Sequence, residues 1–393
     1  KKFFYFFINF FEEIIKKIIF LIGYKKRFVF YESGFNKKFF SKILLSLKTF
    51  PLFYINFRKQ LHIKKHKNRS KFSINGLRSK NEFEEFLFEI IWNHLPYAYL
   101  EEYQYIEKKS LKELPAKTII TGYSYWYNEL FKVWTSQQIL RGAKFIILEH
   151  GGSFQLKMNT MDHLEDIADV NVSWGKELNN NYTRLPPNKL SIRRKIPFKK
   201  EDKITLFDFE SVKYSYRAVG APVGPLVLEE HIQKLSFLKL LSKNVLDLLK
   251  VKPKYLGSWH LEHSYIQTFG KEIISRNNDL NSIIQNSRLI ISGYPQTTFS
   301  EGMYSGVPTI LLFREDLWEI DSMYLELISD LKTKKIIHTD PKFAADHLEN
   351  IFQHEHEWWN SSEIIESRKF FNEICNTVSK NSTSEWVNFF RSF

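Results

Sequence analysis

The chain has 393 residues, 43% of them hydrophobic and 26% charged, which predicts a globular protein long enough for two domains. Its single cysteine, Cys375, excludes a disulfide framework and a cysteine-based zinc cluster, and fits a reducing cytoplasm. The formal net charge is +13.

The positive charge is concentrated at the start of the chain. Residues 1–80 hold 20 Lys and Arg against three acids, Glu12, Glu13 and Glu32, so the remainder is slightly acidic. A basic segment of this kind suits an anionic membrane surface or a negatively charged substrate. No recognition motif for nucleic acid accompanies it, so we expect no nucleic-acid partner.

Residues 3–26 are rich in Phe and Ile but are not expected to span a membrane, because four charged residues lie in their middle. The apolar residues recur every three or four positions, which predicts an amphipathic helix. Such a helix either packs on its own domain or lies in a membrane interface. The protein is therefore expected in the cytoplasm, with a peripheral place at the inner membrane face as an option.

Strands and helices alternate in the first half of the chain. This spacing is typical of βαβ units, which form parallel sheets. The predicted elements are a strand at 26–32, a loop at 58–80, a helix at 81–96, a strand at 117–124, a helix at 127–142 that ends at Gly142, and strands at 143–152 and 169–175.

Residues 184–203 are rich in proline and charge and are predicted to link two domains. A second series follows: strand 204–209, helix 229–250, helix and strand within 280–292, helix 298–306, strands 307–313 and 334–340, and helices beyond 341. The sequence thus predicts an α/β fold of two Rossmann-like domains with a central cleft, the GT-B arrangement. The expected limits are a basic helical segment at 1–80, domains at 81–198 and 203–355, and C-terminal helices at 356–393.

The loop after the predicted strand "RLIIS", which ends at Ser292, carries the features of an anion site. Thr298 and Glu301 have the spacing of a capping box, and a helix N-terminus attracts anions. Gly302 is expected to let a ligand approach closely, and Gly306 to end the helix. The alternative is that the loop only caps a structural helix. The candidate donor-binding residues here are Ser292, Gly293, Thr297, Thr298, Ser300 and Glu301.

A second loop, "LEHGGSFQ" at 148–155, follows the other predicted strand. An imidazole at a strand end suits proton removal from a hydroxyl near neutral pH, so His150 is the candidate base. Glu149 could orient the imidazole or act itself. The alternative is a histidine that only hydrogen-bonds the loop. The candidate acceptor residues here are Gly151, Gly152 and Ser153.

Two weaker candidates remain. In "KYSYRAVG" (213–220), Tyr214, Tyr216 and Arg217 could contact a sugar or phosphate, or the tyrosines could simply pack. His260 and His263 are three residues apart, but no third metal ligand is evident in the sequence. No metal and no cofactor are therefore expected.

Both loops resemble known families. "EHGG" and "SGYPQTTFSEGMYSGVPTILLF" are similar to the two signatures of CDP-glycerol glycerophosphotransferases of teichoic acid synthesis. A closer resemblance, over roughly residues 95–375, is to bacterial transferases associated with surface-polysaccharide genes. It rests on "YLEEYQ", "EHGGSFQ", "DVNVSWG", "YSYR", the loop at 292–306, and "HTDPKFAADHLENIFQHEHEWWNS". The resemblance implies metal-independent catalysis with His150 as base, Thr297 and Thr298 on a donor phosphate, and Glu301 on a ribose or sugar.

The resulting hypothesis is a glycosyltransferase that moves a sugar from a nucleotide-activated donor to a glycan or lipid-linked acceptor of the cell envelope. The alternatives are a polyol-phosphate transferase, a sugar-nucleotide epimerase, or a non-catalytic protein of the same fold that binds a glycan or nucleotide. Product analysis with candidate donors separates the enzymes from one another.

Overall fold

A computed structural model describes residues 14, 18, 28–49, 69, 78–151, 167–175, 182–189, 203–214, 221–254 and 259–393. The amphipathic helix predicted for 3–26 and the loop predicted for 58–80 lie almost entirely outside these residues. Within the described part of the chain, no helix is both long enough and apolar enough to cross a membrane.

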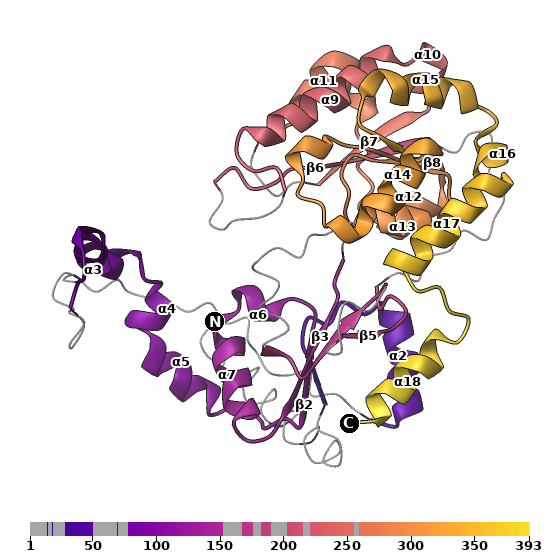
Figure 1. Cartoon of the computed structure of the whole chain (residues 1–393). Helices are drawn as coiled ribbons and strands as arrows, with labels where there is room; N and C mark the ends of the chain where they lie inside the picture. Colours follow the sequence, from indigo (N-terminus) through magenta and orange to yellow (C-terminus); the bar gives the residue numbers. More distant parts are fainter. Residues whose placement is uncertain are drawn as a thin grey trace. The chain divides into compact units, whose positions relative to one another are not determined.

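The first sheet has five strands in the order β1-β2-β3-β4-β5 (Figure 1). Neighbouring strands pair in parallel, as in β1 with β2 and β2 with β3. The strands predicted at 26–32, 117–124, 143–152 and 169–175 are confirmed, whereas β5 was not predicted. The strands are β1 (Phe28–Phe30), β2 (Thr118–Thr121), β3 (Lys144–Leu148), β4 (Val170–Ser173) and β5 (Tyr182–Arg184).

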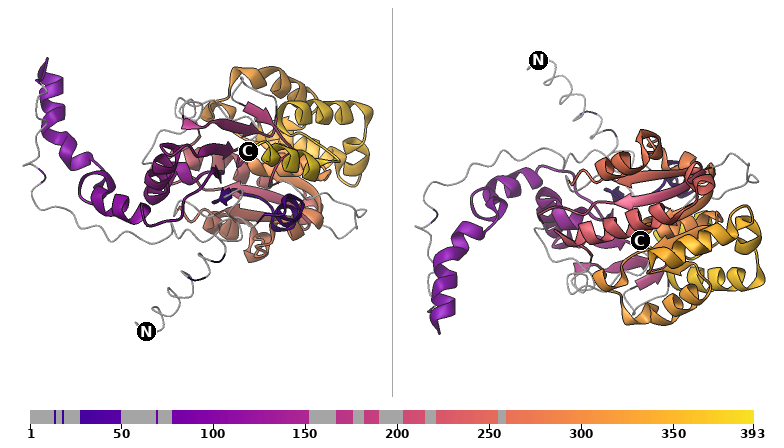
Figure 2. Two further views of the ribbon diagram at one scale, coloured as in Figure 1. Left: turned by 90° about the horizontal axis from the view of Figure 1, so that it is seen from below. Right: turned by 90° about the horizontal axis from the view of Figure 1, so that it is seen from above.

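Helices α3 (Glu82–His94) and α7 (Glu129–Ile139) confirm two predicted helices. Asn81 and Asn128 cap them by accepting backbone N–H groups in the first turn. Gly142 follows α7 with a φ of 87°, which favours glycine. Helix α3 buries no residue and extends away from the sheet (Figure 2), whereas α5 packs on α7, where the Ser110 hydroxyl donates to the Gln137 side chain at 2.9 Å. The other helices of this part are α2 (Lys37–Leu47), α4 (Tyr97–Leu100), α5 (Tyr103–Ser110) and α6 (Ser124–Tyr127).

The second sheet also has five parallel strands, in the order β10-β9-β8-β6-β7. Its strands are β6 (Lys203–Phe209), β7 (Leu249–Lys254), β8 (Ser287–Ser292), β9 (Thr309–Leu312) and β10 (Ile337–His338). Its helices are α9 (Leu226–Leu240), α10 (Lys243–Leu246), α11 (Glu262–Phe269), α12 (Leu280–Gln285), α13 (Thr297–Ser305), α14 (Leu325–Thr333) and α15 (Pro341–Ile351). The two parallel sheets confirm the predicted α/β class with two Rossmann-like parts.

The prediction of one long helix at 229–250 is wrong, because its second half forms helix α10 and the start of strand β7. Helix α9 ends at Leu240, and the Glu349 carboxylate accepts the backbone N–H of Ser242 at 2.6 Å, just beyond it. The lysines of "LKVKPK" alternate with buried residues, so this segment is strand β7. Pro253 is tolerated there because β7 is an edge strand of its sheet.

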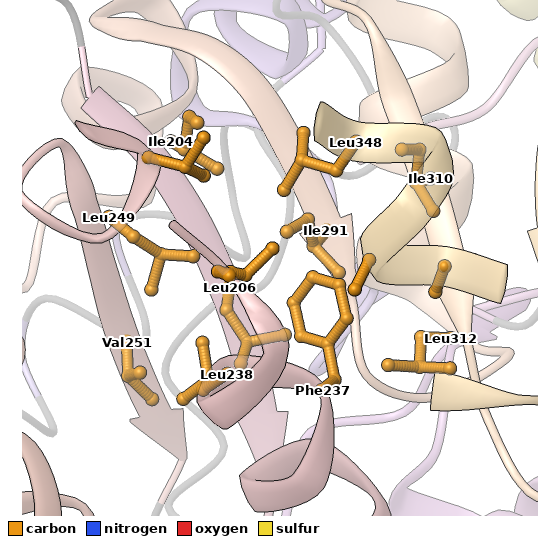
Figure 3. Close-up of a cluster of buried hydrophobic side chains, with 14 of the residues drawn as sticks. Ile204, Leu206, Phe237, Leu238, Leu249, Val251, Ile291, Ile310, Leu312 and Leu348 are labelled. Carbon is orange, nitrogen blue, oxygen red and sulfur yellow. The ribbon is translucent and has the colours of Figure 1, made fainter. Parts of the chain in front are cut away.

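The core of the second sheet lies between its strands and helices α9 and α15 (Figure 3). Leu206 and Ile291 from the strands meet Phe237 and Leu238 from α9, and all four side chains are at most 1% exposed. Burial of one such side chain stabilises the fold by about 1.5–3 kcal/mol, so this cluster fixes the strand ends that carry the loops.

The predicted C-terminal helices are confirmed as α16 (Glu355–Trp359), α17 (Ser362–Cys375) and α18 (Ser382–Arg391). The chain divides into two compact units, residues 1–34, 42–148 and 389–393, and residues 35–41 and 149–388. Both candidate loops, at 149–151 and 292–301, belong to the second unit. The domain limits and the central cleft expected from the sequence stay predictions.

Candidate functional site

The loop between β8 and α13 has the predicted position but not the predicted cap. Helix α13 begins at Thr297, and its N-cap is Gln296, whose side chain makes no capping hydrogen bond. The capping box expected of Thr298 and Glu301 is therefore wrong. The hydroxyl of Thr298 is hydrogen-bonded to the Tyr294 hydroxyl at 2.5 Å instead, and Glu301 lies in the second turn.

The hydroxyl groups of this loop differ in their exposure. Ser292 is fully buried and donates to the backbone oxygen of Tyr294 at 2.8 Å, and Ser300 is fully buried in α13. At the helix start Thr297 is half-buried, whereas the other two candidates, Thr298 and Ser300, are buried. A ligand at this helix start would therefore meet the Thr297 side chain before the other hydroxyls.

Two glycines of this region allow neighbouring elements to pack closely. A Cβ at Gly293 would lie 2.6 Å from the Lys234 Cε and 2.8 Å from the backbone oxygen of Phe207. A Cβ at Gly302 would lie 2.7 Å from the Thr309 Oγ1 in β9. The prediction that Gly302 admits a ligand is wrong, since helix α13 packs on β9 there. Gly306 ends α13 with a φ of 79°, as predicted.

Glu301 is 6% exposed, and burial raises the pKa of its carboxyl group. The positive charges of Lys189 and Lys254 lower this pKa, but by less than burial raises it. Both lysines are exposed, and Lys254 is the last residue of β7. The carboxyl edge of the second sheet thus combines a helix N-terminus with two cations, an arrangement that favours an anion.

The loop after β3 carries the other candidate residues. Glu149 accepts the backbone N–H of Trp174 at 2.6 Å, and His150 follows it, half-buried. Gly151 has a φ of 149°, and a Cβ there would lie 2.0 Å from the Thr297 Oγ1. The two predicted loops therefore meet within the second unit, and His150 is one residue from the point of contact.

A sequence model of the LIC12162 family of transferases matches residues 1–390, nearly the whole chain. The chain belongs to the LIC12162 family of transferases. It has no match among curated proteins.

Solved structures with a related arrangement have little sequence identity to this LIC12162 family transferase. They include Staphylococcus aureus MnaA with UDP, at 10% identity and a TM-score of 0.47 over 93% of this chain and 96% of that one. MurG of Acinetobacter baumannii has 12% identity and a TM-score of 0.43 over 94% of this chain and 100% of that one. CalG4, the calicheamicin glycosyltransferase, has 10% identity and a TM-score of 0.43 over 94% of this chain and 98% of that one. At such values the similarities carry no argument about chemistry.

The carboxyl group of Glu149 has a pKa that burial raises to about 7, although hydrogen bonds from Trp174 and Ser173 lower it. The transferase thus holds a carboxyl group that exchanges its proton near neutral pH, next to His150. A group of this kind can act as a general acid or base without help from a metal.

The raised pKa of Glu149 predicts a pH-dependent cost to stability. The folded state keeps this proton up to about pH 7 whereas the unfolded chain loses it near its ordinary value, so stability falls as pH rises between the two. Glu149→Gln keeps the acceptor for Trp174 and removes the charge. We expect it to raise the free energy of unfolding by about 2 kcal/mol at pH 8 and not at pH 4. Urea unfolding at both pH values measures this, and an equal effect at both would contradict it.

A buried ionic network lies against the loop between β8 and α13, and sequence reasoning missed it. Lys234 of α9 is 1% exposed and lies 2.9 Å from the Asp208 carboxylate at the end of β6 and 3.5 Å from Glu230. Tyr265 donates to Asp208 at 2.8 Å, and Trp318 donates to Glu230 at 2.6 Å. The Lys234 charge lowers the pKa of Asp208, so the ion pair is formed at neutral pH.

Four predicted site residues, Gly152, Ser153, Tyr216 and Arg217, lie outside the described residues. Tyr214 is described and is 83% exposed. The rings of His260 and His263 stack at 5.7 Å, and the described residues contain no group of three or more metal-ligating side chains suited to hold a metal ion. Independence from a metal stays a prediction.

Proposed function

We propose that this transferase moves a sugar from a nucleotide-activated donor to a surface-polysaccharide or lipid-linked acceptor. The donor phosphate binds at the start of α13, beside Lys254 and Lys189. His150 removes the proton from the acceptor hydroxyl, and the reaction needs no metal. The observation that carries the proposal is the approach of Gly151 to Thr297, which brings a candidate base and an anion site together in one unit.

The donor side of the proposal rests on charge. A departing nucleoside diphosphate gains negative charge as the sugar–oxygen bond breaks, and prepositioned positive groups stabilise that charge. Lys254 and Lys189 lie close enough to Glu301 to lower its pKa against the effect of burial. With the N–H groups at the start of α13, they supply the positive potential that a metal ion supplies in other transferases.

Glu301 has two tasks in this proposal. Its carboxylate balances the two lysines and offers an acceptor for hydroxyl groups of the donor's ribose or sugar. A carboxylate that is 6% exposed binds hydroxyl groups more strongly than one in water, since few solvent molecules compete for it. The charge of the site then selects the phosphate, and Glu301 selects a polyhydroxylated group next to it.

Thermal unfolding with a panel of UDP-, CMP-, CDP- and GDP-linked sugars tests the donor site. We expect one of these to raise the unfolding temperature, because a ligand that binds only the native state stabilises it by mass action. Lys254→Gln should weaken binding of that donor about tenfold or more, the usual loss of one charge-assisted hydrogen bond. The matched control is Lys342→Gln, an exposed lysine of α15. Equal weakening by both variants, or no response to any donor, would contradict the proposal.

The basic excess of residues 1–80 supports a place for the enzyme at the inner face of the membrane, where a lipid-linked acceptor would be. Each Lys or Arg near an anionic bilayer contributes about 1 kcal/mol of attraction, which falls within a Debye length. Sedimentation with anionic vesicles is expected to fall with rising salt. A chain that lacks residues 1–27, and so keeps strand β1 of the first sheet, but sediments as well as the full chain would refute this placement.

A further inference from the structure

A cavity of about 580 Å³ opens in the second unit at the far end of helix α13. Helix α13 begins at Thr297, the proposed donor end, and Gly306 beyond its other end lines the cavity. The nine residues of the helix put the two ends about 13 Å apart, so the cavity is separate from the donor loop. It is lined by Arg184, Met303, Tyr304, Ser305, Gly306, Arg368, Lys369, Asn372, Glu373, Thr377 and Val378.

The charged groups of this lining favour an anion. Three cations, Arg184, Arg368 and Lys369, face one acid, Glu373. All but Arg184 come from α17, and among the described lining residues the cations therefore outnumber the acids. Glu373 and Lys369 lie one helical turn apart, yet neither forms an ion pair with another described residue. The Lys369 charge is therefore not cancelled by a partner within the described residues.

Both guanidinium groups are held in place by the fold. Arg184 of β5 donates through Nε to the Thr377 hydroxyl at 2.5 Å and through a terminal nitrogen to the Glu373 backbone oxygen at 2.9 Å. Arg368 stacks over the Trp359 ring at 4.3 Å and donates to the Trp359 backbone oxygen at 3.2 Å. Cations held this way lose little conformational entropy when an anion binds.

A second feature of the cavity calls for a hydrogen-bond donor from the ligand. The side-chain oxygen of Asn372 is buried and has no hydrogen-bond donor among the described residues. A buried acceptor left in this way costs free energy, and a rotation of the Asn372 amide toward the cavity that it lines would let a ligand hydroxyl recover it. Tyr304 adds an aromatic side chain to the same lining, a surface on which a sugar ring can pack.

We propose that this cavity is a binding site for a small phosphorylated sugar, separate from the donor site. The phosphate lies among Arg184, Arg368 and Lys369, and a sugar hydroxyl donates to the Asn372 oxygen. The volume of about 580 Å³ holds a sugar together with its phosphate, whereas inorganic phosphate would leave most of it to water. The ligand is thus distinguished from a bare anion by its hydroxyl groups, and from a neutral sugar by its charge.

Isothermal titration of the full chain with glucose 1-phosphate, glucose and inorganic phosphate tests the site. We expect glucose 1-phosphate to bind most tightly of the three. Lys369→Gln should weaken its binding about threefold or more, and Glu373→Gln should strengthen it by a similar factor, because the two side chains are exposed and carry opposite charges. Asn372→Ala should reduce the preference for glucose 1-phosphate over inorganic phosphate.

Two controls separate this site from the donor loop. Lys369→Gln should leave binding of the nucleotide-linked donor unchanged, and Lys254→Gln should weaken donor binding far more than it weakens glucose 1-phosphate binding. The proposal is overturned if the wild-type chain binds none of the three probes, if Lys369→Gln and Glu373→Gln change affinity in the same direction, or if Lys254→Gln rather than Lys369→Gln abolishes binding. A failure of these tests leaves the donor site untouched, because its own variants and ligands measure it.

Discussion

Replacement of His150 by Asn is expected to lower the turnover number of sugar transfer by about two to four orders of magnitude, the usual contribution of general base catalysis. Asparagine keeps a polar side chain of similar reach but cannot take a proton near neutral pH. The Michaelis constant for the donor should change little, since the proposed donor site is at the start of α13. Steady-state kinetics with the donor identified by thermal shift measure both constants.

The matched control for His150 is His354→Asn, which changes an exposed histidine before helix α16. It should retain full activity, and both variants should unfold at the temperature of the wild-type chain. If His150→Asn keeps its activity while Glu149→Gln loses it, the proton acceptor is the Glu149 carboxyl group, whose pKa of about 7 also suits the task. If both variants keep full activity, the loop after β3 has no catalytic role.

The alternation of apolar runs with amphipathic segments was enough to predict most of both sheets. Strands such as β3 and β8 are buried on both faces, and they read as short continuous apolar runs bounded by glycine or polar residues. Strand β7 was missed because "LKVKPK" follows a helix directly and contains Pro253. Its alternation is the signal that could have found it, since the three lysines all lie on the less buried face.

The candidate site could be predicted only in part. Its loops follow from glycines and hydroxyls next to strand ends, which are visible in the sequence. The Lys189 and Lys254 charges near Glu301 depend on residues 112 and 47 positions away, a proximity that no local pattern reports. The cap of α13 was wrongly predicted because Tyr294, four residues earlier, binds the Thr298 hydroxyl. Local motifs therefore located the loop, and tertiary contacts decided which groups remain accessible.

The buried network of Lys234, Asp208 and Glu230 could not be predicted from local patterns either. It connects the core to the loop between β8 and α13. Glu230 and Lys234 are four residues apart, a spacing that usually indicates an exposed ion pair on a helix surface. Here both are buried, because Asp208 at the end of β6 supplies a second carboxylate to Lys234. The Gly293 turn packs against the Lys234 side chain, so the position of this side chain sets the path of the loop.

Lys234→Met is expected to destabilise the native state by about 3–5 kcal/mol, the usual cost of removing one partner of a buried ion pair. Methionine fills a similar volume, so the loss comes from the buried Asp208 and Glu230 carboxyl groups that are left without their cation. The free energy of unfolding in urea measures it. Lys239→Met, at an exposed lysine of the same helix, is the control and should change stability by less than about 0.5 kcal/mol.

Two further measurements separate the charge effect from a packing effect. Asp208→Asn combined with Lys234→Met should recover part of the lost stability, because Glu230 is then the only carboxylate of the pair that is buried without its cation. The loss in Lys234→Met should also shrink as pH falls. In the wild-type chain the Lys234 charge holds the pKa of Asp208 below its usual value, and without that charge burial raises it. Acid then protonates Asp208 and removes the cost, whereas a loss caused by packing alone would stay the same at pH 5 and pH 8.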